Sequence, residues 1–378
     1  MLLFALIAAL LIEQLVPLEA DNAVHAWARR WVTYTRSKVL VAHPIHVWLW
    51  WSAAVLLPVV LSVLVYQLLL AVAWPLAWLW LVGVLYLTMG FRQFSHYFSR
   101  IRDALQEGRE DDALAALAQW RQVDEAEARR SDWVSRVLSL ALLAAQRHVM
   151  GVWLAFVVLG ALGLGPAGAV LYRMAEFVAR VWRVQTEPTQ ALGQGAPQPA
   201  DGADQTGHAD HDGGDDEVAV QCALLSGQAW HYVDWLPVRM SALGFAAAGN
   251  FEGVVGAWRD AKDSLQTSND SLLLAAGAGA LHVTLQDQPA AGVSPQAASA
   301  DATQDLAVMS ASLLDEQDSA VHADHIAPHS QDTAVDDTHT PASPAKPRHV
   351  AALASLVWRV VVLAMVVLAG LTLVSWLN

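Results

Sequence analysis

The chain has 378 residues, of which 55% are hydrophobic and only 15% charged, and its net charge is −14. Soluble domains carry about 25% charged residues, so this composition favours a membrane protein. The 17 tryptophans agree, because tryptophan is enriched at membrane–water interfaces. The single cysteine, Cys222, excludes an internal disulfide and a multi-cysteine zinc site, and we expect a buried thiol.

Much of the negative charge lies in two tracts, Asp201–Glu217 and Asp301–Asp337, which are poor in large apolar residues. Such segments cannot bury enough apolar surface to offset chain entropy, so we expect both to be disordered. Their acidity argues against nucleic-acid binding, which needs clustered lysine and arginine. Their histidines and aspartates impose no coordination geometry, and we assign no metal site to them.

The N-terminal segment, residues 1–46, begins with MLLFALIAALLIEQLVPLE. This stretch resembles the apolar part of a signal peptide, but it has no basic start and no A-x-A cleavage site. Glu13 also interrupts it before a full span is reached. We expect a retained, partly buried helix followed by a cytoplasmic segment.

Residues 47–91 are almost entirely apolar over about twice the 20 residues that a membrane-spanning helix needs. The run breaks near Ala73-Trp74-Pro75, which predicts two helices joined by a tight turn. We therefore expect a transmembrane hairpin here.

Residues 92–147 carry both signs of charge, with apolar residues at helical spacing on either side of Glu107-Gly108. This pattern predicts a water-facing pair of helices. The region is rich in arginine, and basic residues also precede the hairpin, so the positive-inside rule places both flanks in the cytoplasm.

Residues 148–183 hold a second apolar run that is interrupted by Gly-Leu-Gly-Pro. A single crossing would put the following arginines on the wrong side of the membrane, unless residues 230–248 supply a compensating crossing. The alternative is a segment that enters and returns, bending at Gly160–Gly168. We favour this bent or re-entrant helix pair.

The remaining chain divides into an acidic insert (184–217), core helices (218–286), a second acidic linker (287–348) and a C-terminal transmembrane helix (349–378). Pro237-Val238-Arg239 suits a helix start with Asp234 as the N-cap. Gly277 and Gly279 lack a GxGxxG frame, so they predict close helix packing rather than phosphate binding. The expected fold is all-α: a polytopic integral membrane protein with a cytoplasmic helical subdomain.

Ionisable residues near the predicted membrane segments are the candidates for a polar site, because such groups are costly at membrane depth and usually pair. They are Asp124, Arg173, Glu176, Asp234 and Arg239. Arg173 and Glu176 have the i,i+3 spacing of an ion pair on one helix face. His43 and His96, together with His148, either line one polar cavity or serve as interfacial hydrogen-bonding groups.

Several segments, in order, resemble the CobD/CbiB family of membrane proteins and the related AmpE proteins. They are His43-Pro44, FSHYFSRIRDAL (94–105), GLGPAGAVLYRM (163–174), WHYVDWLPVRM (230–240) and SNDSLLLAAGAGALHVTL (268–285). CobD/CbiB proteins are adenosylcobinamide-phosphate synthases of cobalamin biosynthesis. AmpE is an inner-membrane protein associated with β-lactamase induction.

The resemblance implies a multi-pass protein of the bacterial inner membrane, in contact with lipid and with a corrinoid or another polar small molecule. It implies Mg-ATP as a cofactor only if the chain is an ATP-dependent amide ligase. Three acidic motifs of the synthases are altered: the positions read Gln146-Arg147, Glu176-Phe177-Val178-Ala179 and Trp230-His231. The chain has no Walker-type loop either. We therefore keep two expectations, a cobalamin-pathway synthase and a non-catalytic sensor or regulator of the AmpE kind.

Overall fold

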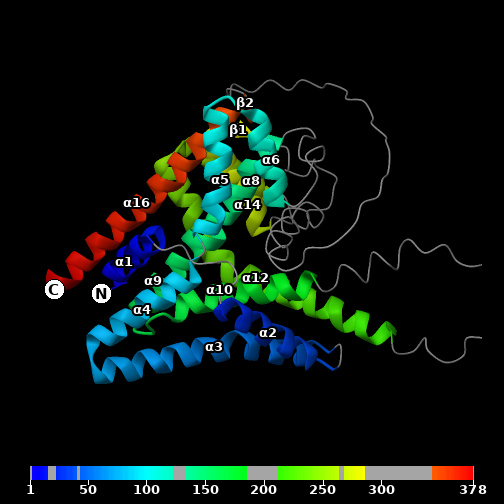
Figure 1. The fold of residues 1–378 in the computed structure, drawn as a ribbon, viewed down its shortest axis with the longest axis vertical. Helices are drawn as coiled ribbons and strands as arrows, with labels where there is room; N and C mark the ends of the chain where they lie inside the picture. The colour runs from blue at the N-terminus through cyan, green and yellow to red at the C-terminus, as the bar shows by residue number, and fades with distance from the viewer. Residues whose placement is uncertain are drawn as a thin grey trace, which may run out of the picture.

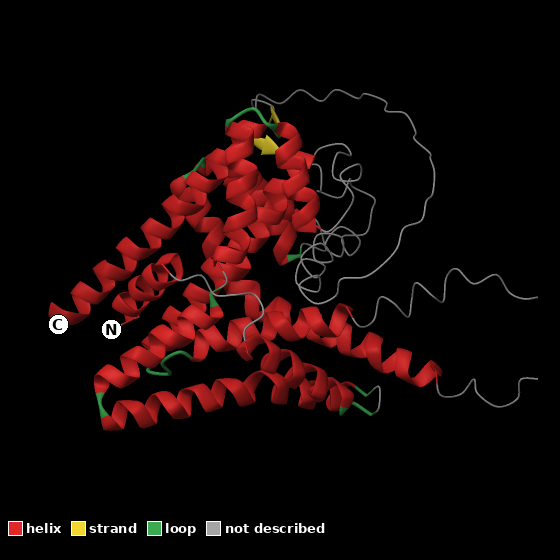
Figure 2. Cartoon of the chain, in the orientation of Figure 1, coloured by secondary structure: helices red, strands yellow, loops and turns green. Residues whose placement is uncertain are grey.

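A computed structural model of the chain describes residues 2–15, 23–40, 43–89, 91–121, 133–184, 212–263, 268–285 and 343–377. Asp124, residues 201–211 and all of residues 301–337 lie outside these ranges. Residues 212–217 of the first acidic tract, which were expected to be disordered, instead form the start of a helix. Apart from short loops, the described chain is helical except for one pair of two-residue strands (Figure 2), which confirms the all-α prediction.

The helices follow one another along the chain as shown in Figure 1. They are α1 (Leu2–Leu15), α2 (Ala23–Ser37), α3 (Pro44–Val72), α4 (Trp74–Thr88), α5 (Phe91–Gln106), α6 (Glu110–Arg121), α8 (Trp133–Ala145), the π-helix η1 (Gln146–Met150), α9 (Gly151–Ala161), α10 (Ala167–Val184), α12 (Asp212–Ala248), α13 (Phe251–Asp263), α14 (Asn269–Leu281) and α16 (Pro347–Leu377). The strands β1 (Val283–Thr284) and β2 (Ser343–Pro344) pair in parallel.

Within the described residues, three stretches of helix are long and apolar enough to cross a membrane: Pro44–Val72, Trp133–Ala161 and Pro347–Val374. α1 and α4 are apolar but shorter. The N-terminal segment therefore contains two helices, α1 and the polar α2, where the sequence predicted one.

The break between α3 and α4 falls at Ala73, within the predicted turn. Ala73 is extended and ends α3, and Pro75 lies in the first turn of α4, where its missing N–H costs nothing. The indole of Trp80 on α4 donates to the carbonyl of Ser62 on α3 (3.2 Å), so the two helices pack as a hairpin.

The Gly-Leu-Gly-Pro interruption is a chain reversal between α9 and α10. Gly163 and Gly165 have φ values of +81° and +58°, which favour glycine. After the turn, a Cβ added to Gly168 would lie 1.8 Å from the carbonyl oxygen of Ala155, so the two backbones touch. The chain thus bends within the predicted range, but the helix before the bend begins at Trp133 rather than at residue 148.

The buried apolar side chains form two cores. The first joins α5, α6, α8, α14 and the start of α16; the second joins α1–α4, α9 and α10. α12 crosses from the second core, at Trp230, to the first, at Val238. The 133–161 helix also runs from one core to the other, and η1 lies where it leaves the first core. Ala145, before η1, belongs to the first core, and Val152, after it, belongs to the second.

The predicted helix start at Pro237 is wrong, because Pro237 lies inside α12 and Asp234 is therefore no N-cap. The anchoring of α12 in both cores offsets the hydrogen bond that proline removes. The packing prediction for the later glycines is confirmed: Gly279 lies against the backbone of Gly253, and Gly277 against Leu142. Cys222 is a buried free thiol, as expected.

Candidate functional site

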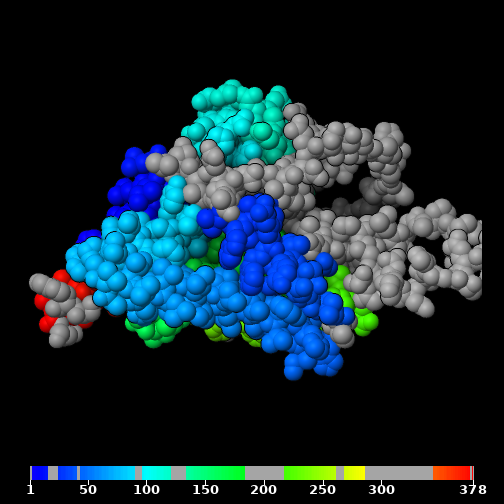
Figure 3. Space-filling view, turned by 60° about the horizontal axis from the view of Figure 1, so that its bottom comes forward, coloured from blue at the N-terminus to red at the C-terminus, as the bar shows by residue number. Residues whose placement is uncertain are grey.

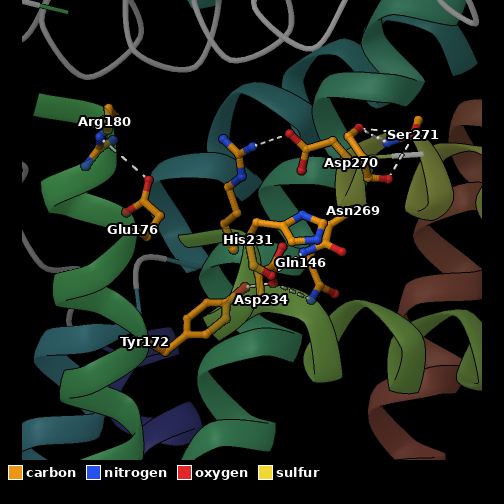
Figure 4. A network of polar contacts seen from close by, with 11 residues as sticks. Gln146, Tyr172, Glu176, Arg180, His231, Asp234, Asn269, Asp270 and Ser271 are labelled. Carbon is orange, nitrogen blue, oxygen red and sulfur yellow. Dashed lines mark hydrogen bonds and ion pairs between the residues drawn. The ribbon is translucent and has the colours of Figure 1, made fainter. Parts of the chain in front are cut away.

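A network of polar side chains lies where the two cores meet. It draws residues from η1, α10, α12 and α14 (Figure 4), and several of its members are buried. Because both cores are apolar, each of these groups depends on the others for hydrogen bonds. This makes the junction the candidate functional site of the described chain.

The π-helix η1 brings two of these polar residues into the junction. It interrupts a helix that is otherwise α-helical from Trp133 to Ala161, and both Gln146 and Arg147 are buried there. Single π turns inside α-helices are rare and frequent at functional sites. Gly151 follows directly, and a Cβ on it would lie 2.0 Å from the ring of Tyr172, so only glycine lets α10 approach.

Asp234 is the centre of one half of the network. Its Oδ1 accepts hydrogen bonds from the Tyr172 hydroxyl (2.7 Å) and from the Gln146 amide (3.3 Å). The amide oxygen of Gln146 accepts in turn from the Ser241 hydroxyl (2.6 Å). The other carboxylate oxygen, Oδ2, is buried and has no hydrogen-bond partner among the described residues.

Burial raises the pKa of Asp234 to about 7, against the opposing effect of the hydrogen bond from Tyr172; the Asp270 carboxylate raises it further. Asp234 therefore exchanges its proton close to neutral pH, unlike an ordinary aspartate. A carboxylate with a free oxygen and this pKa can hydrogen-bond either a donor or an acceptor on a ligand.

An ion pair forms the second half of the network. Arg147 of η1 pairs with Asp270 of α14 at 2.7 Å, and the two side chains are only 5% and 15% exposed. Asp270 is held in the first turn of α14, whose N-cap is Ser268. The adjacent Asn269 donates to the carbonyl of His231 on α12 (2.8 Å). The pair therefore ties η1 to α14 across the junction.

The predicted pair on α10 is also present. Glu176 accepts from Arg173 (3.3 Å) and also contacts Arg180 one turn later (3.6 Å). The three side chains are at most 13% exposed. One carboxylate thus faces two guanidinium groups, and the α10 side of the junction is electropositive.

The sequence-predicted residues divide into three groups. Arg173, Glu176 and Asp234 are members of the junction. Arg239 lies at its edge: it stacks on Trp235 at 4.1 Å and approaches Asn269 at 3.4 Å. The other two described candidates lie elsewhere, and Asp124 falls outside the described residues.

His43 and His96 do not join the network. His43 is the exposed N-cap of α3 and its ring contacts His46. His96 is exposed on α5 and its ring contacts Tyr97. Of the two alternatives for the histidines, one cavity or separate interfacial groups, these two positions favour the second, because each residue makes its ring contact within its own helix.

Sequence reasoning missed Gln146, Arg147, Tyr172 and Asp270 as site residues. Gln146 and Arg147 were interpreted only as replacements of acidic residues. The available signal was that two polar residues interrupt a long apolar run. It was overlooked because the apolar segment was expected to begin only at residue 148. Asp270 had no local signal, because its partner lies on a distant helix.

The acidic groups at the junction do not fit Mg-ATP. Magnesium is held by carboxylate oxygens in octahedral geometry, but Glu176 and Asp270 are engaged by arginines and Asp234 by Tyr172 and Gln146. In the described ranges, no three His, Cys, Asp or Glu side chains are grouped as a metal site requires. What the junction offers is buried guanidinium groups beside one carboxylate with a free oxygen.

Comparison with known proteins adds no relative: no family model, no curated protein and no solved structure matches the chain.

Proposed function

We propose that the chain is a multi-pass protein of the bacterial inner membrane, of the CobD/CbiB–AmpE group, with a binding or regulatory role. Its ligand is an anionic small molecule that reaches the junction of the two cores. The three long apolar helices support the membrane placement, and the motifs near residues 43, 163, 230 and 268 support the group.

The observation that carries this proposal is the charge balance on α10. Arg173 and Arg180 share Glu176, and Arg147 lies buried on the neighbouring element. Guanidinium groups in a low-dielectric setting bind phosphate or carboxylate strongly, through paired N–H donors. The side chains of Arg173 and Arg180 are 12% and 13% exposed, so neither is wholly closed to an anion.

A cobalamin-pathway synthase is the second candidate. The order of the motifs favours it, as does the free oxygen of Asp234. In that role the chain would join aminopropanol phosphate to adenosylcobyrate, with Mg-ATP driving the amide bond. We place this candidate second because the carboxylates of the junction are already paired.

The test uses the full chain in nanodiscs with adenosylcobyrate, aminopropanol phosphate and Mg-ATP, with an active family synthase as the control. Product is sought by mass spectrometry. In parallel, the melting temperature is measured with aminopropanol phosphate alone and with inorganic phosphate. We expect no product, but stabilisation by at least one of the two phosphates.

Arg173→Gln should abolish this stabilisation, while Arg109→Gln should not. Arg109 is a matched control because it also sits between two carboxylates, Glu107 and Asp112, but is exposed on another part of the chain. Product formation would establish the synthase candidate instead. Neither product nor stabilisation, or stabilisation that persists in Arg173→Gln, would overturn the proposed site.

A further inference from the structure

Helix α2 has an exposed aromatic stripe that the proposed function does not use. Val24, Trp27, Trp31 and Tyr34 recur at intervals of three and four residues, which places them on one helix face. Val24, Trp27 and Tyr34 are exposed, whereas Val32 and Thr35 on another face are buried against the protein.

The aromatic rings along this stripe are ordered against one another. Trp27 stacks on Trp31 with ring centroids 6.2 Å apart, and Trp31 contacts Tyr34 at the same distance. The ammonium group of Lys38 lies 5.1 Å from the centre of the Tyr34 ring. The stripe therefore ends in a positive charge, at the C-terminal end of the helix.

The stripe is continuous with the apolar surface of α3. The indole of Trp31 donates to the carbonyl of Ala54 on α3 (3.1 Å), and Trp182 on α10 donates to the carbonyl of Val32 (3.4 Å). In Figure 3, α2 lies in dark blue along the lighter blue α3 at the surface of the molecule. Ile45, Leu49 and many later apolar residues of α3 are exposed.

The basic residues of α2 are not balanced by acidic residues in the sequence that follows the helix start. No aspartate or glutamate occurs between Asp21 and Asp103, whereas α2 and its end carry Arg29, Arg30, Arg36 and Lys38. Arg30 and Lys38 are exposed, and neither pairs with a carboxylate of the described residues. An aromatic stripe flanked by unneutralised cations is complementary to a surface that is apolar below and anionic above.

We propose that α2 packs beside α3 at the membrane interface and binds anionic phospholipid headgroups through Arg30 and Lys38. Tryptophan and tyrosine rings prefer the depth of the headgroups, and long basic side chains reach outward from there to phosphates. Helices with one apolar face and one basic face bind membrane surfaces in this way. This inference rests on the membrane placement in the proposed function.

The test uses the full chain in nanodiscs, with a bimane label on Trp27→Cys in a Cys222→Ala background. Quenching is measured with spin-labelled phosphatidylglycerol, with spin-labelled phosphatidylcholine and with aqueous iodide. We expect strong quenching by both lipids, and phosphatidylglycerol should be preferred. Each basic side chain contributes about fivefold to that preference, so Arg30→Gln/Lys38→Gln should reduce it toward equality.

Arg100→Gln/Arg259→Gln is the matched control, because it removes two exposed arginines from α5 and α13, and it should leave the preference unchanged. A second label at Leu61→Cys, on the exposed face of α3, reports the membrane placement itself. If label 61 is quenched by lipid and label 27 only by iodide, this inference fails while the placement stands. If label 61 is not quenched by lipid, the placement fails. Equal quenching of label 27 by both lipids in the wild type overturns headgroup recognition.

Discussion

Two stretches of helix in this chain have the same length and similar composition, yet different surroundings. Pro44–Val72 and Trp133–Ala161 each have 29 residues and are apolar enough to span a membrane. In the first, 17% of the most apolar window is buried in the protein; in the second, 67% is buried. Length and apolarity alone therefore cannot tell a helix that faces lipid from a helix that faces other helices.

The difference follows from what the two helices carry. α3 has apolar residues all round and packs along part of its surface only. The other helix contains Gln146 and Arg147 in its π turn, and these residues need partners that only protein can supply. The following four experiments would break or sharpen this contrast.

The largest effect is expected for Arg147→Met. It would leave the largely buried Asp270 without its cation, which costs about 3 kcal/mol of unfolding free energy. Chemical or thermal unfolding of the purified protein measures it. Arg109→Met, in an exposed pair beside α6, should have no measurable effect. A similar, small loss in both variants would mean that the 133–161 helix is not held by its polar partners.

Asp234 predicts how stability depends on pH. Its pKa is raised in the folded state to about 7, from an ordinary value of 3.8. The free energy of unfolding is therefore highest below about pH 4. It falls by about 4 kcal/mol as the pH rises toward 7, because the folded protein holds this proton more tightly than the unfolded chain does. Asp234→Asn should remove this dependence and be the more stable form at pH 8. Melting curves at pH 5 and pH 8 test it, with Asp260→Asn as an exposed control; parallel curves for wild type and Asp234→Asn would contradict the burial of this carboxyl.

Gly168→Ala should disrupt the close contact of α9 and α10. The new Cβ would meet the carbonyl oxygen of Ala155, and the helices must separate, at a cost of about 3 kcal/mol. Gly83→Ala on α4 meets nothing within 4 Å and should be neutral or slightly stabilising. Equal melting temperatures for the two variants would show that this contact is looser than the structure has it.

Leu61→Arg tests whether α3, the less buried of the two long helices, faces lipid. Leu61 is exposed on α3, and an arginine near the middle of a bilayer costs about 2.5 kcal/mol or more. Val255→Arg is the control, because Val255 is also an exposed apolar residue but lies on α13, outside the three long apolar helices. It should change stability by no more than about 0.5 kcal/mol. Stability in nanodiscs, or the inserted fraction, separates them. A harmless Leu61→Arg would place α3 in water.

The parts of the fold that were predictable are those set by local chemistry. The break at Ala73 follows from Pro75, which fits the first turn of a helix without losing a hydrogen bond, and the reversal after Ala161 follows from two glycines with positive φ. The close helix contact at Gly279 could also be predicted from the local sequence, because such an approach requires a residue without a side chain. The pair of Arg173 and Glu176 was readable because its members lie one turn apart.

The rest depended on contacts between distant residues. Arg147 and Asp270 lie on helices far apart in the sequence, so nothing local identifies Asp270 as a partner. Pro237 is a strong local signal for a helix start, but packing of α12 in both cores overrides it. The start of the long helix at Trp133 was concealed by the mixed composition before it.

The small β1–β2 pair has a consequence for how the gene can change. Val283 pairs with Ser343 and Thr284 with Pro344, so the chain leaves and re-enters the folded body at one point. The two ends of the intervening segment are therefore held side by side by the body, and for a flexible chain a doubling of the length between such ends costs only about 0.6 kcal/mol. The segment between β1 and β2 is therefore a suitable site for insertion. A reporter domain with adjacent termini could be placed there without redesigning the helices, and evolution can change the length of this segment at little cost in stability.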